Sequence, residues 1–210
     1  MSAAITSIGA VTGFGLGLDL TVAALLEGRT AIGPVTRFPT TGLCSSLASE
    51  APADVELIAA AAELRQPPAE DRASRLLLAA LADALRGRSL EATRRRGVVV
   101  GTTKGALERA LSSEERGIFP TEDLLGSPAR VLAAATSSRG PVYTTGAACA
   151  SSAVALGEAL ALVEDGGCDE VVVGGTEALH AFIYQGFHAL KALSAVPAPR
   201  PDRSALRLSP

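Results

Sequence analysis

The chain has 210 residues, a formal net charge of −3 at pH 7 and an isoelectric point near 5.5. This charge excludes the broad basic face that nucleic-acid binding requires, so no nucleic-acid partner is expected. The hydrophobic content of 48% is sufficient for a core, which is aliphatic because aromatic residues make up only 3%. A chain of this length forms one α/β domain or two small ones.

Targeting signals are not evident. Residues 1–15 lack the basic flank and the continuous apolar run of a signal peptide. The longest apolar helical stretch, residues 150–163, is too short to span a bilayer and contains Glu158. The three cysteines show neither metal-ligand spacing nor a disulfide framework. These patterns predict a cytoplasmic protein with no membrane segment, and they indicate no metal.

The N-terminal segment begins with a predicted strand, Ala3–Ile8. A glycine-rich turn, residues 9–17, leads into a predicted helix over Leu18–Glu27. The glycine spacing does not fit the G-x-G-x-x-G fingerprint of dinucleotide-binding proteins, and no G-K-S/T sequence follows. We therefore expect these glycines to permit a tight backbone turn, and no cofactor is predicted.

The next stretch, residues 28–68, is predicted to be largely irregular because it is rich in proline, with a short helix near Val55–Leu64. A clear helix is predicted over Asp71–Arg86, where leucines recur at helical spacing and Gly87 follows the last turn. The basic triplet Arg94–Arg96 is interpreted as a solvated loop before a strand.

Three further strands are predicted, at Gly97–Gly101, Pro141–Thr145 and Glu170–Gly175. Helical patterns lie between or beside them, at Ala106–Glu115, Thr121–Thr136 and 150–163. Alternating strands and helices predict an α/β layered fold, with a mostly parallel sheet and helices on both faces.

The helix over residues 150–163 has almost no polar face, which predicts burial on every side. One sheet can cover only one side of a helix. We therefore expect a second covering layer that this chain does not itself provide.

Cys149 stands immediately before this helix, and a glycine and two alanines connect it to the preceding strand. Strand, small-residue turn, nucleophile and helix follow one another in this order in a nucleophile elbow. The helix dipole and the unpaired N–H groups of the first turn would favour a thiolate there. The alternative is a structural cysteine, which is the interpretation for Cys44 and Cys168.

His180 and His188 are the only histidines, and they flank a short apolar segment after the last predicted strand. Neither has a carboxylate partner at helical spacing. We expect packing or surface roles for both, rather than catalysis.

Several segments occur together in an order and spacing typical of one family. They are ITSIGAVTGFG, LLEGRTAIGPVTRF, GVVVGTTKGALE, TTGAACASS, ALVEDGGCDEVVVGGTEAL and GFHALKALS. The chain thus resembles the N-terminal half of a β-ketoacyl-acyl carrier protein synthase, a thiolase-fold condensing enzyme of fatty-acid or polyketide biosynthesis. The resemblance implies a thiolase-like layered fold, with residues 1–210 forming the N-terminal domain.

The resemblance also implies roles for individual residues. Cys149 would accept an acyl group from an acyl carrier protein as a thioester, with its own backbone N–H as one oxyanion donor. A carbanion from malonyl-carrier protein would then attack the thioester. The segment Thr102, Thr103, Lys104 and Gly105 would border the acyl pocket, where Lys104 replaces an apolar gate residue. Either Lys104 extends to solvent, which we favour, or the pocket is altered.

In this family, decarboxylation needs two further groups, usually histidines, from a C-terminal half. The sequence stops within an arginine-containing segment after which the family continues. We interpret the chain as a truncated or split synthase, and we expect no complete condensation by the chain alone.

Three interpretations remain open. The first is an enzyme half that acts with acyl carrier protein and forms a homodimer through the strand Pro141–Thr145, or a heterodimer with a ketosynthase or a C-terminal-half chain. The second is a non-catalytic partner resembling a chain-length factor; Cys149 argues against it, and Lys104 argues mildly for it. The third is a structural protein or pseudoenzyme.

Overall fold

The computed structural model describes residues 3–91, 94–115 and 124–194. The chain divides into two compact units. Unit 1 comprises Met1–Ala10 and Ala53–Ala178, and unit 2 comprises Val11–Pro52 and Leu179–Pro210. Each unit is described separately.

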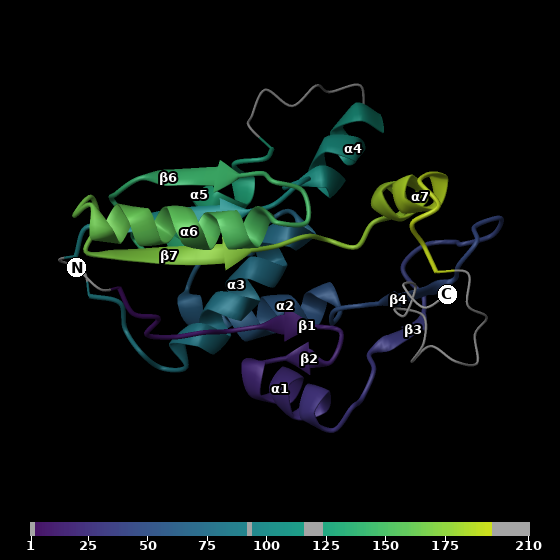
Figure 1. Ribbon diagram of the computed structural model, residues 1–210, viewed down its shortest axis with the longest axis horizontal. Helices are drawn as coiled ribbons and strands as arrows, with labels where there is room; N and C mark the ends of the chain where they lie inside the picture. Colours follow the sequence, from purple (N-terminus) through teal and green to yellow (C-terminus); the bar gives the residue numbers. More distant parts are fainter. Residues whose placement is uncertain (1–2, 92–93, 116–123, 195–210) are drawn as a thin grey trace. The chain divides into compact units, whose positions relative to one another are not determined.

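Unit 1 is built on a three-stranded parallel sheet (Figure 1). Strand β5 (Arg96–Gly101) lies between β6 (Val142–Thr145) and β7 (Glu170–Gly175). In the register, Val98 pairs with Val142 on one side and with Val172 on the other. A β-branched run between glycines suits a central strand that is covered on both faces. The predicted parallel sheet is confirmed, and the three strands predicted at Gly97–Gly101, Pro141–Thr145 and Glu170–Gly175 agree with the observed ones to within a residue.

Helices cover both faces of this sheet, as predicted. They are α3 (Arg72–Leu85), α5 (Ser127–Ala135) and α6 (Ser151–Glu164). Val98 and Val100 pack with leucines and alanines of α3 and α5. Val99 points to the opposite face and packs against Ala155 and Ala159 of α6. The alternation of side chains along β5 thus divides the core of unit 1 into two clusters.

The predicted helix over Asp71–Arg86 is confirmed as α3, with caps at both ends. The Asp71 carboxylate accepts hydrogen bonds from the backbone N–H and the hydroxyl of Ser74, both at 2.8 Å. This is an N-cap that satisfies an otherwise free helical N–H. At the other end, Arg86 and Gly87 both have positive φ, which ends the helix.

The remaining helices of unit 1 are α2 (Asp54–Ala61), the 3-10 turn η1 (Ala62–Leu64) and α4 (Leu107–Glu115). They match the predicted helices over Val55–Leu64 and Ala106–Glu115. The helix predicted over Thr121–Thr136 begins only at Ser127, with Pro128 in its first turn, where proline is favoured. Residues 121–123 of that prediction lie outside the described residues.

The predicted strand Ala3–Ile8 is wrong, because this segment contains no strand. Its polar groups bond instead to the C-terminal part of α3 and beyond: the Ser7 hydroxyl donates to the Ala84 carbonyl, and the Arg88 guanidinium donates to the Thr6 carbonyl at 3.1 Å. Ile5 and Ile8 are exposed. A β-prone segment becomes a strand only where a neighbouring strand pairs with it.

Helix α6 differs from the prediction that it is buried on every side. Ser151, Ala155 and Ala159 are buried, whereas Leu156 and Leu160 are 48% and 44% exposed. The sheet covers one face of α6, and within the described residues the opposite apolar face stays exposed. The second covering layer that we expected is not found among the residues that the structure describes.

Unit 2 contains short elements that sequence patterns did not predict, apart from helix α1. The elements are β1 (Val11–Thr12), β2 (Gly15–Leu16), α1 (Leu18–Leu26), β3 (Ile32–Pro34), β4 (Leu47–Ser49) and α7 (Ala181–Ala189). Strands β3 and β4 pair antiparallel within the stretch expected to be irregular. Buried Tyr184 of α7 packs its ring against Phe38, and its hydroxyl donates to the Leu47 carbonyl at 3.0 Å. Among the described helices of both units, none has the length and apolarity needed to cross a membrane.

Candidate active site at the start of helix α6

The turn at residues 146–150, here called the nucleophile turn after the role predicted for Cys149, connects the end of β6 to the start of α6. Cys149 is exposed on this turn, one residue before the helix N-cap Ala150. Ala148 adopts a left-handed backbone conformation with φ of 50°, which is uncommon for a residue with a side chain. Strained conformations of this kind cluster at functional sites, although Arg86 adopts one here to end α3. The strand, small-residue turn and helix that the elbow prediction requires thus follow one another in the structure.

Ser151 closes the nucleophile turn with its side chain. Its hydroxyl accepts a hydrogen bond from the Ala147 N–H at 2.9 Å and donates one to the Ala148 carbonyl at 2.7 Å. The same carbonyl also accepts from the Ser151 N–H at 3.1 Å. Sequence reasoning missed Ser151, because a serine in this position carries no signal until the turn geometry is known.

Two glycines allow α6 to begin close against the strand ends. A Cβ atom at Gly101 of β5 would lie 2.5 Å from the carbonyl of Ser151, and one at Gly175 of β7 would lie 2.9 Å from the Ser152 Cβ. Neither distance is possible without displacement of the helix. The nucleophile turn is therefore held at the carboxyl edge of the parallel sheet, where loops of α/β proteins commonly form sites.

The predicted substrate-binding segment, Thr102–Gly105, leaves β5 at the same edge of the sheet. The backbone N–H of buried Thr102 donates to the Thr145 carbonyl at 3.2 Å, so this segment is bonded to the residue before the nucleophile turn. Thr103 is bonded through its N–H and its hydroxyl to the carboxylate of Glu177, which follows β7. The structure thus links Thr102 to the residue before the nucleophile turn, and Thr103 to the loop after β7. Sequence reasoning missed Glu177.

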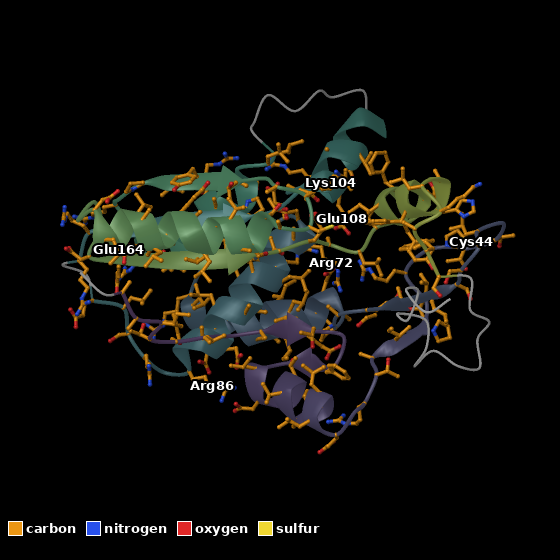
Figure 2. All side chains as sticks on the ribbon, viewed as in Figure 1. Cys44, Arg72, Arg86, Lys104, Glu108 and Glu164 are labelled. Atoms are coloured by element: carbon orange, nitrogen blue, oxygen red, sulfur yellow. The ribbon has the colours of Figure 1, made fainter. Side chains whose placement is uncertain are left out.

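Gly105 and Lys104 complete this segment. Gly105 has a φ of 52°, and a Cβ atom there would lie 2.8 Å from the Leu125 Cα, so the position requires glycine. Lys104 is exposed at the start of the segment that leads to Glu108 and α4 (Figure 2). Its exposure agrees with the first of the two interpretations, in which its charge reaches solvent.

A second polar cluster lies between α6 and β6. Thr145 donates to the Glu158 Oε1 atom at 3.2 Å, while the Glu158 Oε2 atom is buried with no hydrogen-bond partner among the described residues. Burial raises the pKa of Tyr143, and the nearby negative charge of Glu158 raises it further. From the sequence alone, Glu158 could be recognised only as a charged residue within an otherwise apolar helix.

The other cysteines and the histidines fit local structural roles. Cys168 is buried, and burial raises the pKa of its thiol, which keeps it protonated. Within unit 2, the Nδ1 atom of His188 accepts from the N–H of exposed Cys44 at 3.2 Å. The Nδ1 atom of His180 accepts from the Phe182 N–H at 3.1 Å and caps α7. Within the described parts of the chain, no three His, Cys, Asp or Glu side chains gather as a metal site would require.

The chain matches one protein family over nearly its whole length. A family model described as "Beta-ketoacyl synthase, N-terminal domain" matches residues 2–204. The chain belongs to the β-ketoacyl synthase family. The resemblance seen in the sequence motifs is thereby confirmed.

Among its relatives is the 3-oxoacyl-acyl-carrier-protein synthase 2 of Synechocystis sp., 29% identical over 208 residues, which cover 90% of this chain and 49% of the relative. The tetracenomycin polyketide synthase ketoacyl synthase alpha subunit of Streptomyces glaucescens is 29% identical over 212 residues, covering 91% of this chain and 49% of that protein. This β-ketoacyl synthase domain thus spans about half the length of the curated relatives it matches.

Solved structures agree on the fold. The ishigamide ketosynthase/chain length factor matches with a TM-score of 0.74 and 23% identity, covering 90% of this chain and 51% of that one. The β-ketoacyl synthase domain described here therefore has the layered α/β architecture of the thiolase fold that the motifs implied.

Proposed function

We propose that Cys149 is the nucleophile of a ketosynthase active site and takes an acyl group from an acyl carrier protein. The observation that carries the proposal is an exposed cysteine on a strained turn, at the carboxyl edge of the sheet, in a β-ketoacyl synthase domain. The Cys149 sulfur bonds to the thioester carbonyl carbon, and the bond from that carbon to the carrier sulfur breaks. The carrier thiol leaves with the proton that Cys149 gives up.

Condensation is the second stage of the proposed reaction. Loss of CO₂ from malonyl-carrier protein leaves a carbanion, which attacks the acyl carbon and releases the Cys149 thiolate. The backbone N–H of Cys149 serves as one donor to the oxyanion in both stages. The family's decarboxylating groups, usually two histidines, are assigned to a C-terminal half or to a partner chain. This domain alone is expected to stop at the acyl-cysteine.

The segment Thr102–Gly105 is proposed to border the bound acyl chain. Its bonds to Thr145 and Glu177 place it beside the nucleophile turn, which supports this role. Lys104 is exposed, so its charge need not be buried in an acyl pocket. The proposal therefore assigns the apolar contacts to Thr102, Thr103 and Gly105 rather than to the lysine.

A protein partner is proposed for the exposed face of α6 and for strand β6. Leu156 and Leu160 form an uncovered apolar surface, and β6 is an edge strand of the described sheet. Exposed edge strands and apolar faces are sites of association. We assign β6 to a homodimer or to a heterodimer with another ketosynthase-type chain, and the α6 face to a C-terminal half.

The alternative function is a non-catalytic partner resembling a chain-length factor. One matching structure is a ketosynthase/chain length factor pair, and Lys104 departs from the apolar gate residue of the family. A protein of this kind would bind a ketosynthase but would not become acylated.

One experiment separates the two functions. The chain is incubated with acyl-carrier protein, and peptides are examined for an acyl adduct by mass spectrometry. An adduct on Cys149 that persists in Cys44→Ala and disappears in Cys149→Ala supports the proposed function. An unmodified Cys149 would favour the non-catalytic partner. Addition of malonyl-carrier protein should give no ketoacyl product until a C-terminal half or a partner chain is added.

A further inference from the structure

The carbonyl of Ala148 is held by two donors that belong to one residue. The Ser151 hydroxyl donates to it at 2.7 Å, and the Ser151 N–H donates to it at 3.1 Å. The Ser151 side chain is only 4% exposed, and its hydroxyl also accepts from the Ala147 N–H. A hydroxyl that is both donor and acceptor in this way has its orientation set.

This carbonyl and the Cys149 N–H belong to the same peptide group. A trans peptide is planar, so its C=O and N–H point in opposite directions. The Ala148 carbonyl points to the first turn of α6, so the Cys149 N–H must point away from that turn. Ala148 is left-handed at φ 50°, a conformation that costs a residue with a Cβ about 1–2 kcal/mol. The peptide would therefore tend to rotate if it were released.

We propose that Ser151 is a positioning residue that orients the backbone N–H of Cys149 as an oxyanion donor. The inference rests on the proposed acyl-accepting role of Cys149. Ser151 itself does not contact the substrate. Its hydroxyl fixes the one peptide group whose N–H must face the carbonyl oxygen under attack.

Two reactions of Cys149 distinguish orientation of the N–H from general support of the turn. Acetylation by p-nitrophenyl acetate passes through an oxyanion, whereas alkylation by iodoacetamide displaces iodide and forms no oxyanion. A residue that only stabilises the turn would change both rates together. Ser151→Ala is expected to slow acetylation of Cys149 about tenfold and to change alkylation little. This effect is smaller than the roughly 10²–10³-fold loss typical when an oxyanion donor is removed outright.

Matched variants and internal cysteines serve as controls. Ser152→Ala makes the same change at the next, exposed residue and should alter neither rate. Exposed Cys44 provides a reference rate within the same molecule, and labelling of buried Cys168 reports unfolding. If Ser151→Ala unfolds, the pair Ser151→Thr and Ser151→Val replaces it. Their side chains have the same shape, and only threonine should preserve acetylation.

The outcomes separate this inference from the proposed function. Equal slowing of acetylation and alkylation in Ser151→Ala, or no slowing of either, would overturn the positioning role. If Cys149 of the unmodified chain is acetylated readily but takes no acyl group from acyl-carrier protein, the proposed function fails while the orienting role of Ser151 stands. If Cys149 of the unmodified chain is acetylated no faster than Cys44, both the proposed function and the positioning role of Ser151 are overturned.

Discussion

The Glu177 carboxylate accepts two hydrogen bonds from Thr103, one from its backbone N–H at 2.9 Å and one from its hydroxyl. It thereby joins the loop after β7 to the segment that leaves β5. The two residues are 74 positions apart in sequence, so the contact depends on the parallel pairing of the two strands.

Glu177→Ala should loosen the segment Thr102–Gly105 without unfolding unit 1. A hydrogen bond of this kind contributes about 1 kcal/mol, so protection of the Thr103 amide against hydrogen exchange should fall roughly fivefold. Exchange measured by NMR would show this. Glu177→Gln keeps an acceptor oxygen and should retain most of the protection. Equal protection in the alanine variant and the unmodified chain would contradict the prediction.

Arg96 should be among the most sensitive charged residues in unit 1. The interpretation of Arg94–Arg96 as a solvated loop is wrong for Arg96, which begins β5. Its guanidinium is buried and bonded to the Glu170 carboxylate at 2.5 Å and to the carbonyls of Thr136 and Glu91. Arg96→Met leaves these acceptors without donors, so the free energy of unfolding should fall by about 3 kcal/mol. Urea denaturation measures the change.

The neighbouring arginine provides the control for this prediction. Arg95 pairs with Asp169 at 3.1 Å, but both side chains are largely exposed. Exposed ion pairs contribute little, so Arg95→Ala should leave the free energy of unfolding nearly unchanged. Similar losses of unfolding free energy in Arg96→Met and Arg95→Ala would contradict the prediction, because they would show that burial does not determine how much each arginine contributes.

Gly101→Ala should displace the start of α6. Its Cβ would meet the Ser151 carbonyl at 2.5 Å, so strand and helix must separate. We expect a loss of about 1–3 kcal/mol in unfolding free energy and slower acetylation of Cys149. Gly157→Ala, within α6, meets no atom within 4 Å and should instead be neutral or stabilising. A Gly101→Ala variant with unchanged stability and unchanged acetylation would contradict the close packing.

Protonation of Glu50 in acid should make unit 2 less stable. Burial alone would raise the pKa of Glu50, but hydrogen bonds from Thr36 and from the Arg37 backbone outweigh it and hold the pKa below 4.5. The folded state therefore binds this proton more weakly than the unfolded chain. The resulting stabilisation is complete above a pH of about 4.5 and is lost as the pH falls through the lower folded-state value.

Thermal melts of the unmodified chain and of Glu50→Gln would test this sign. The unmodified chain should be more stable by about 1 kcal/mol at neutral pH, where its carboxylate accepts from Thr36 at 2.7 Å and 2.9 Å. The difference should disappear as the pH falls below the lowered folded-state pKa of Glu50. A stability difference between the two proteins that increased as the pH fell would contradict the predicted sign.

Local patterns were sufficient to predict the strands and helices of unit 1. The run Val98–Val100 between glycines, and a helix bounded by Asp71 and Gly87, carry their signals within a few residues. The pairing of β3 with β4 could not be predicted, because three-residue strands depend on partners distant in the chain. Ala3–Ile8 was mispredicted for the converse reason: its composition suits a strand, but none of the described strands pairs with it.

The same distinction applies to the site. Cys149 could be predicted because strand, small-residue turn and helix adjoin it in sequence. Glu177 and Glu158 could not, since their partners, Thr103 and Thr145, are brought to them only by the sheet and its helices. Ser151 is close in sequence, but its importance depends on the orientation of a single peptide group.

The alternation of Val98, Val99 and Val100 has a consequence for how this domain can vary. Val99 packs only with the cluster that supports the helix after Cys149, whereas its two neighbours pack with the cluster on the other face. A change in side-chain volume at Val99 thus acts on the helix that follows Cys149, and a change at Val98 or Val100 acts on the helices of the opposite face. Substitutions at these adjacent positions can therefore change the reactivity of Cys149 and the stability of the domain separately.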